Sequence, residues 1–256
     1  MNRLDWKMAM ALLLGGCLLC SSCRTASCEV FSVEGTAVKM DTLWQAAPDN
    51  EMARLLAPYR QKMDSLRHRV VGRAAVSMDR ERPEDLLQNL VADVLREAAV
   101  MVQPQPADMG LMNIGGLRNV LTQGDVTYET IFEILPFENS LCVLTLTGRN
   151  LLLLFENIAA RGGEGVSGVT LRISTDGRLL EARVGGQPVE PDRLYTVATI
   201  DYLAEGNDGM PALLQAEKRE CPPDATLRDL FLRYVERQTA QGKELTSKRE
   251  GRIVRR

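Results

Sequence analysis

The chain has 256 residues, of which 45% are hydrophobic and 25% charged, and its formal net charge is −3. This length supports one substantial core, and the slight acidic excess argues against a nucleic-acid polymer as partner, because proteins that bind one normally carry a basic excess. The single histidine, His68, excludes a metal centre built from several histidine ligands.

Residues 1–22 predict a secretory signal. Arg3 and Lys7 make the first residues mildly basic, and an apolar run follows at residues 8–19. That run is shorter than the ~20 residues that a membrane span needs. The Ser-Ser-Cys sequence ending at Cys23 resembles the processing site of a bacterial lipoprotein, so we expect cleavage before Cys23 and lipidation of that residue. Lipidation at Cys17, an ordinary cleaved signal and an inserted anchor helix remain open.

Residues 23–47 are interpreted as a tether, and residues 48–69 as a helical lead-in. In the lead-in, apolar side chains recur at intervals of three and four residues, which is typical of an amphipathic helix: Met52, Leu55, Leu56, Tyr59, Met63 and Leu66. His68 falls near the end of this helix. A basic residue there interacts favourably with the helix dipole and needs no ligand role.

Residues 70–256 are expected to form one domain. Its helices and strands mix without the regular alternation of a doubly wound sheet, which favours an α+β fold of mixed sheets packed with helices. In chain order we expect a strand at 74–78, a helix opened by Pro83-Glu84-Asp85, a strand at 108–113, a helix at 127–134, a strand at 140–147, a helix at 151–160 capped by Asn150, strands at 169–173, 182–184 and 194–200, and a closing helix at 226–238.

Three cysteines follow Cys23. Cys28 lies in the tether, and Cys142 lies in an apolar alternating run where a buried, inert thiol is the default. A disulfide between Cys142 and Cys221 fits an oxidising compartment, but spacing alone does not decide between the two states.

Two glycine-containing loops follow apolar strands. In the first, the amide of Asn113 both donates and accepts hydrogen bonds, which suits the edge of a base. Gly115 and Gly116 let backbone approach a ligand closely, and the planar fork of Arg118 suits phosphate.

The second loop and a helix-to-strand junction add aromatic and acidic groups. Tyr202 and Phe137 each supply a flat ring, and Asp208 supplies a carboxylate able to accept two hydroxyl protons, as from a ribose. Each feature taken singly has a structural explanation, since Gly-Gly and Asn-Asp-Gly are usually turns and an aromatic ring is usually core.

Five ordered motifs resemble the C-terminal domain of the 5′-nucleotidases, a family that also includes UDP-sugar hydrolases and 2′,3′-cyclic phosphodiesterases. The resemblance covers about residues 70–256 and rests on these segments: Asn113-x-Gly-Gly-x-Arg118, Gly124-Asp-Val-Thr127, Leu135-Pro-Phe-Glu-Asn139, Leu146-x-Gly148 and Asp201-Tyr-Leu-Ala-x-Gly-x-Asp208-Gly209. In that family this domain binds the nucleotide, while an N-terminal metallophosphoesterase domain cleaves it.

The resemblance implies a role for each matching residue. Asn113 would contact the base, Phe137 and Tyr202 would enclose it, Asp208 would hold the ribose, and Arg118 would hold the phosphate. A further family arginine lies upstream, where Arg80 and Arg82 both match loosely and the choice stays open. Ile114 replaces the small residue that usually follows the family's asparagine, so we expect a narrower site beside the base.

The motifs of the family's catalytic metallophosphoesterase domain have no counterpart in this sequence. That domain uses two metals held by Asp, His and Asn ligands, yet no Asp-x-His or Gly-Asn-His sequence occurs, and the residues between Cys23 and residue 70 are too few for that fold. We therefore expect no catalytic residue, metal or other cofactor in this chain, with divalent metals only in a partner.

The leading interpretation is a membrane-tethered lipoprotein that acts as the nucleotide- or nucleoside-binding subunit of a split 5′-nucleotidase. It would work with a separate metallophosphoesterase in extracytoplasmic nucleotide catabolism, in the periplasm or at the cell surface. The alternatives are a stand-alone lipoprotein that scavenges nucleotides or nucleotide sugars, a hydrolase that uses unrecognised residues, and a domain that has lost nucleotide binding.

Overall fold

The computed structural model describes residues 32, 35–37 and 50–256. The predicted signal, Cys23, Cys28 and most of the predicted tether lie outside the described residues. The chain divides into two units, residues 1–53 and 54–256, and the second carries every strand of the described part. None of the helices in that part is both long and apolar enough to cross a membrane.

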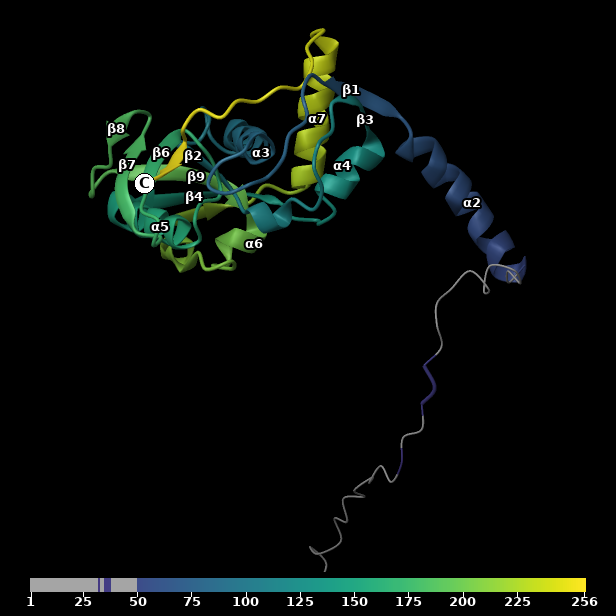
Figure 1. Cartoon of the computed structure of the whole chain (residues 1–256), viewed down its shortest axis with the longest axis horizontal. Coiled ribbons are helices and arrows are strands. Elements are labelled where there is room, and N and C mark those ends of the chain that lie inside the picture. The colour runs from purple at the N-terminus through teal and green to yellow at the C-terminus, as the bar shows by residue number, and fades with distance from the viewer. Residues whose placement is uncertain (1–31, 33–34, 38–49) are drawn as a thin grey trace, which may run out of the picture. The chain divides into compact units, whose positions relative to one another are not determined.

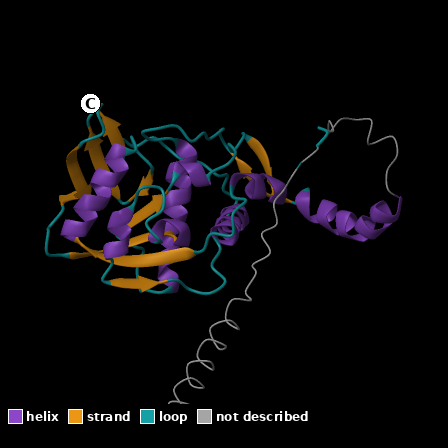
Figure 2. Ribbon diagram, turned by 90° about the horizontal axis from the view of Figure 1, so that it is seen from below, coloured by secondary structure: helices purple, strands orange, loops and turns teal. Residues whose placement is uncertain are grey.

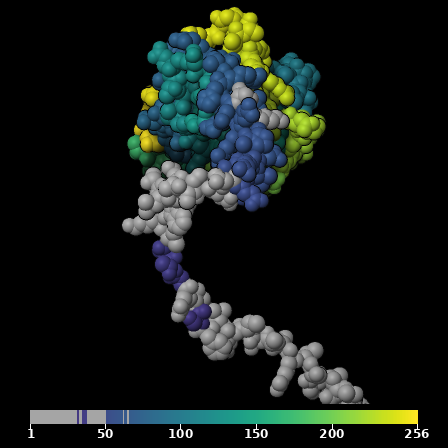
Figure 3. All heavy atoms as spheres, turned by 90° about the vertical axis from the view of Figure 1, so that its right-hand side faces the viewer, coloured from purple at the N-terminus to yellow at the C-terminus, as the bar shows by residue number. Residues whose placement is uncertain are grey.

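The first described helix, α2, spans Asn50–Arg67, within the predicted lead-in. Its described side chains are exposed apart from the half-buried Ala53, and Figure 3 shows its blue atoms at the front of the face on view. Strand β1 (Val70–Ala74) follows and pairs antiparallel with β3 (Gly124–Thr127). The prediction of a strand at 74–78 was wrong, because its partner β3 begins at Gly124, directly opposite Ala74, and the ladder stops there.

A five-stranded sheet forms the centre of the domain (Figure 1). Its strands lie in the order β10 (Lys218–Glu220), β4 (Leu141–Thr147), β9 (Leu194–Ile200), β2 (Met109–Met112) and β5 (Gly165–Ser167). Strands β4 and β9 pair antiparallel from Leu141 opposite Ile200 to Thr147 opposite Leu194. Strand β2 runs parallel to β9, and the predicted strands at 108–113, 140–147 and 194–200 are confirmed.

A second sheet of four strands holds the C-terminus. Its order is β11 (Ile253–Arg255), β6 (Val169–Ile173), β7 (Leu179–Val184) and β8 (Gln187–Pro188). The carboxylate of Glu84 accepts hydrogen bonds from the backbone N–H groups of Glu250 and Arg252, which fixes the segment before β11. The turn between β6 and β7 lies where the Asp-Gly sequence predicted it.

Helices pack beside these sheets, as Figure 2 shows in purple and orange. Helix α3 (Leu86–Ala98) begins after Asp85, whose carboxylate accepts from the N–H of Leu86, and continues into the 3-10 turn η2 (Ala99–Met101). Helix α3 lies against β2 and β5, and its close approach needs a glycine: a Cβ on Gly110 would stand 2.2 Å from the carbonyl oxygen of Ala92.

Helix α5 spans Gly148–Ala160 and starts earlier than expected. The predicted cap, Asn150, is wrong: Thr147 is the N-cap, and its hydroxyl accepts from the N–H of Asn150. The reason is that the chain leaves β4 at Thr147 in an extended conformation, so the helix begins directly at Gly148.

The remaining helices close the domain. Helix α4 (Tyr128–Ile134) has a capping box at Thr127, and α7 (Leu227–Ala240) is capped by Thr226. Short turns follow the central strands and precede β10: η3 (Ile114–Gly116), α6 (Asp201–Ala204) and η4 (Pro211–Gln215). The mixed sheets and packed helices confirm the predicted α+β class.

A disulfide joins Cys142 of β4 to Cys221, directly after β10. The sequence left a buried thiol and a disulfide open, and the structure has the disulfide. It ties the edge strand β10 to its neighbour β4 in the main sheet. The 79-residue separation encloses the segment that carries Tyr202 and Asp208.

Candidate functional site

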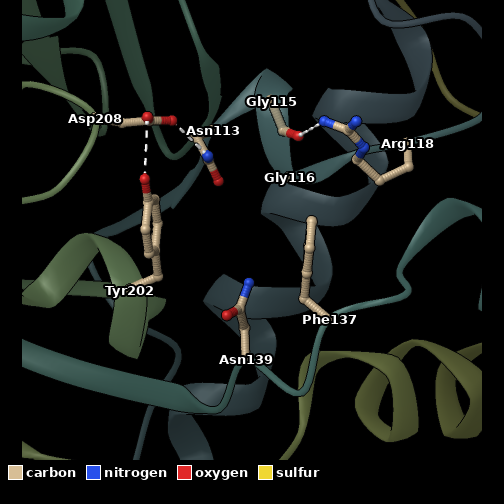
Figure 4. Close-up of a pocket in the computed structure, with 8 residues that line it drawn as sticks. All are labelled: Asn113, Gly115, Gly116, Arg118, Phe137, Asn139, Tyr202 and Asp208. Carbon is tan, nitrogen blue, oxygen red and sulfur yellow. Dashed lines mark hydrogen bonds between the residues drawn. The ribbon is translucent and has the colours of Figure 1, made fainter. Parts of the chain in front are cut away.

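Three loops meet at one edge of the central sheet. Strands β2 and β9 are parallel, so η3 and α6, which follow their carboxyl ends, emerge at the same edge. Strand β4 is antiparallel to β9, so the segment that leads into β4 also lies there. This topology brings Asn113, Phe137 and Tyr202 together from distant parts of the sequence (Figure 4).

The three loops line a cavity of about 360 Å³, within the lower range of small-molecule sites. The structure places all seven residues of the predicted binding set at this cavity, together with one that carried no predicted role: Asn113, Gly115, Gly116, Arg118, Phe137, Asn139, Tyr202 and Asp208. Their binding roles stay predictions, while their convergence in one cavity is a feature of the fold.

Asp208 is the hydrogen-bonding centre of the cavity. Its Oδ2 accepts from Nδ2 of Asn113 at 2.6 Å and lies 3.5 Å from Nη2 of Arg161, and its Oδ1 accepts from the hydroxyl of Tyr202 at 3.3 Å. The negative charge of Asp208 raises the pKa of the Tyr202 phenol, and burial and the hydrogen bond act in the same direction. Tyr202 therefore remains a protonated donor at neutral pH.

Two aromatic rings stand on opposite sides of the cavity (Figure 4). Phe137 is 47% exposed and Tyr202 is 40% exposed, so both rings offer surface to a flat ligand. The guanidinium carbon of Arg118 lies 6.0 Å from the centre of the Phe137 ring, and Nη1 of Arg118 donates to the carbonyl of Gly115 at 3.2 Å. Arg118 thus keeps donors available beside the ring.

The loop that carries Phe137 is held by Arg228 of α7. Nη1 of Arg228 donates to the carbonyl oxygens of Leu135 and Pro136, each at 3.3 Å, and Nη2 pairs with Glu138. The Arg228 side chain is only 9% exposed. A buried cation therefore fixes the backbone before Phe137 and the side chain of Glu138 after it.

A second buried group, Glu164, connects the first loop to two arginines. Its carboxylate is fully buried and accepts from Nη2 of Arg82 at 2.7 Å, from Nε of Arg161 at 2.7 Å and from the N–H of Ile114 at 2.6 Å. Arg161 also reaches Asp208. The pKa of Arg161 is raised: burial opposes this, but the hydrogen bond and charge of Glu164 and the charge of Asp208 outweigh it.

The two arginines proposed from sequence for phosphate do not line the cavity. Arg82 is engaged with Glu164 and with the carbonyl of Gly163. Nε of Arg80 is buried without a hydrogen-bond partner in the described part of the chain. Their assignment to phosphate stays a prediction, and Arg161 is the additional cation that reaches the cavity's carboxylate.

Sequence reasoning missed four residues at or behind the cavity: Asn139, Arg161, Glu164 and Arg228. Asn139 lies inside a motif used for the resemblance, so its position was a usable signal. Glu164 and Arg161 lie in a glycine-rich break with no periodic pattern, and Arg228 lies on an amphipathic helix that gave no sign of its loop contacts. Within residues 50–256 no group of three or more His, Cys, Asp or Glu is arranged to hold a metal ion.

Comparisons with known proteins identify the family of this domain. A family model described as the 5′-nucleotidase C-terminal domain matches residues 70–215. The protein UshA of Yersinia enterocolitica is 25% identical over 189 residues, which cover 72% of this chain and 34% of UshA. The endonuclease YhcR of Bacillus subtilis is 30% identical over 165 residues, 61% of this chain and 13% of YhcR.

Solved structures show the same fold. The 5′-nucleotidase precursor of Thermus thermophilus superposes with a TM-score of 0.68 at 27% identity, covering 82% of this chain and 44% of that one. The NAD nucleotidase of Haemophilus influenzae superposes with a TM-score of 0.61 at 18% identity and covers 81% and 41%. The chain spans about a third of UshA and under half of these structures. Since the family model matches more than half of its residues, the chain belongs to the 5′-nucleotidase C-terminal domain family.

Proposed function

We propose that this chain binds a nucleotide or nucleoside in the cavity between η3, α6 and the segment before β4. The observation that carries this proposal is the convergence of two exposed rings, a carboxylate and an arginine on one cavity: Phe137, Tyr202, Asp208 and Arg118. A base fits between the two rings, the carboxylate accepts hydrogen bonds from ribose hydroxyls, and the guanidinium binds phosphate.

The chain acts as the binding subunit of a split 5′-nucleotidase, and a separate metallophosphoesterase supplies the metal chemistry. Support comes from the family membership and from the chemistry of the cavity. Its single carboxylate, Asp208, hydrogen-bonds to Asn113 and Tyr202, so it serves as an acceptor for a ligand rather than as part of a metal cluster.

An extracytoplasmic location, with a lipid anchor on Cys23, belongs to the same proposal. The disulfide between Cys142 and Cys221 supports it, because structural disulfides persist in oxidising compartments. Radiolabelled fatty acid incorporated into the full chain, and lost in a Cys23→Ala variant, tests the anchor.

Calorimetry tests the binding function. Residues 29–256 are titrated with AMP, adenosine and UDP-glucose, beside a Tyr202→Ala, Asp208→Ala double variant. We expect saturable binding that falls roughly 10- to 100-fold in the double variant, since stacking alone contributes about 1–3 kcal/mol per base. The matched control replaces a tyrosine and an aspartate outside the cavity, Tyr59→Ala and Asp192→Ala, and retains the wild-type affinity.

The outcomes separate the alternatives. Binding by the folded wild type without any metallophosphoesterase activity in its native cells favours a stand-alone scavenging protein. Equal binding by both double variants places the ligand elsewhere. Absence of binding by the folded wild type, alone and with a metallophosphoesterase added, contradicts the proposal.

A further inference from the structure

One face of α2 carries apolar side chains that are exposed within the described part of the chain. Leu56, Tyr59, Met63 and Leu66, which we call the α2 seam, follow one another at steps of three, four and three residues. They are 36%, 67%, 49% and 43% exposed, and Leu55 beside them is 62% exposed. The steps place them on one side of the helix, in the pattern of a coiled-coil contact.

An exposed seam of this kind indicates a binding partner. A surface helix normally turns its apolar stripe toward a core, and contiguous exposed apolar surface marks interaction sites. Arg67 at the end of α2 pairs with Glu129 of α4, which links the helix to the domain, while the side chains of the seam are exposed. Helices with such a seam bind in apolar grooves of other proteins.

The position of α2 argues for the partner's identity. The helix ends at Arg67, and the family model begins at residue 70. That model describes a C-terminal domain, so α2 lies at its junction with whatever precedes it in longer relatives. The match to the Thermus thermophilus structure covers 82% of this chain, whereas residues 70–256 make up 73% of it, so the match extends into the residues before Val70.

The charged residues of α2 are mostly basic. Its sequence carries four basic residues and two acidic ones. Arg60 and Arg67 directly follow the seam residues Tyr59 and Leu66, and Asp64 directly follows Met63, so one edge of the seam carries two basic residues and one acidic residue. A groove with acidic edges is the complementary surface.

We infer that the α2 seam is the docking surface for the metallophosphoesterase, inserted in an apolar groove with acidic edges. The inference rests on the proposed function, since it names where the catalytic partner binds. Where both domains lie on one chain, their junction holds them together. Here the α2 seam holds together a binding domain and a catalytic domain on separate chains. The nucleotide cavity lies on other elements, so docking through α2 leaves its residues available to the ligand.

Site-specific photo-crosslinking tests the docking surface. A photoreactive benzoylphenylalanine replaces Tyr59 or Met63 in the full chain, expressed in its native cells. The control carries it at Gln61, which is exposed and lies across the same helix from Tyr59. We expect Tyr59 and Met63 to capture a protein whose sequenced peptides carry metallophosphoesterase metal-ligand motifs, and Gln61 not to. Equal capture at Gln61, capture of a second copy or of lipid alone, or no capture overturns the inference.

A second measurement separates this inference from the binding proposal. The variant Tyr59→Ser, Met63→Ser keeps the cavity, so its calorimetric affinity for AMP equals that of the wild type while the cross-linked complex is lost. If AMP binds and the seam captures nothing, the docking surface is wrong and the binding function stands. If the seam captures the metallophosphoesterase and AMP does not bind, docking stands and nucleotide binding is wrong.

Discussion

Nδ2 of Asn113 donates to Oδ2 of Asp208 at 2.6 Å, which joins two loops that lie 95 residues apart in sequence. Asp208 adopts a φ of 53°, in the left-handed region that residues other than glycine seldom occupy. Nδ2 of Asn207 donates to the carbonyl of Tyr202 at 2.9 Å and holds this turn together. The two halves of the cavity are therefore connected before any ligand binds, which reduces the ordering that binding requires.

The Tyr202 phenol reports on this connection. Its pKa lies above the ordinary value of 10.0, chiefly because of the charge of Asp208, so Asp208→Asn lowers the pKa toward that value. An acid with a raised pKa in the folded state contributes stability below pH 10, and that contribution is lost as the pH rises further. An NMR titration of isotope-labelled tyrosine checks this. Tyr234, whose pKa is raised mainly by burial, serves as the control, and an unchanged Tyr202 contradicts the prediction.

Gly115 and Gly116 form a matched pair for testing the first loop. A Cβ on Gly116 would stand 2.5 Å from Cε of Met112 and 2.8 Å from Oδ1 of Asn113, whereas a Cβ on Gly115 would meet atoms no nearer than 3.7 Å. We expect Gly116→Ala to lower the free energy of unfolding by about 1–3 kcal/mol and to displace the Asn113 amide from Asp208. Gly115→Ala changes stability little. Urea denaturation measures both, and equal losses would exclude the steric explanation.

Glu164 is the buried partner of two arginines, Arg82 and Arg161. Replacing it by glutamine leaves two like charges around a neutral group, so we expect the free energy of unfolding to fall by roughly 3 kcal/mol and the nucleotide affinity to fall with it. The control is Glu129→Gln, because Glu129 pairs with Arg67 at the surface and such pairs contribute little. Chemical denaturation of both variants measures the two losses in unfolding free energy. A Glu164 variant as stable as the control contradicts a role for Glu164 in neutralising the two arginines.

Arg228 fixes the backbone before Phe137, so Arg228→Met frees that loop. We expect weaker nucleotide binding, and a decrease of about 2 kcal/mol in unfolding free energy from the carbonyl oxygens left without donors. Arg237→Met on the same helix removes an exposed pair with Glu97 and is the control. Thermal unfolding and calorimetry are measured for both. Wild-type nucleotide affinity in the Arg228 variant would show that Phe137 is positioned without it.

The disulfide is expected to stabilise the fold through the loop it closes. For a separation of 79 residues, constraint of the unfolded chain corresponds to about 4 kcal/mol. The Cys142→Ser, Cys221→Ser variant should lose this amount in guanidinium denaturation, and reductant should have the same effect on the wild type but none on the variant. A reductant effect that persists in the variant would assign the stabilisation to another cause.

Much of the fold follows from local pattern. The apolar runs at β4 and β9 and the helical spacing of α3 and α7 extend over seven or more residues, long enough to show a period. Strands β5, β10 and β11 have three residues each. They form because a longer neighbouring strand offers free backbone N–H and C=O groups, so their own sequences show no strand pattern.

The residues of the cavity also differ in how far the sequence predicts their roles. Asn113, Tyr202 and Asp208 lie in loops whose residue types and order carry a recognisable motif. Glu164 and Arg228 act through contacts with residues 50 or more positions away in the chain, and a charged residue that is buried by distant segments looks like any surface charge in sequence. Such groups emerge only when the packing of the whole domain is known.

The aromatic rings of the cavity lie on segments that adjoin a hydrogen-bonded ladder. Phe137 lies just before β4 and Tyr202 just after β9, at the end where these strands pair. The ladder fixes the points from which these two segments leave the sheet, on neighbouring strands about 4.8 Å apart. Sliding the ladder by one residue would invert every side chain of β4. If the proposed slot binds a base, the sheet preserves the slot, and a change in the base it accepts is expected to arise through its two amide side chains, Asn113 and Asn139.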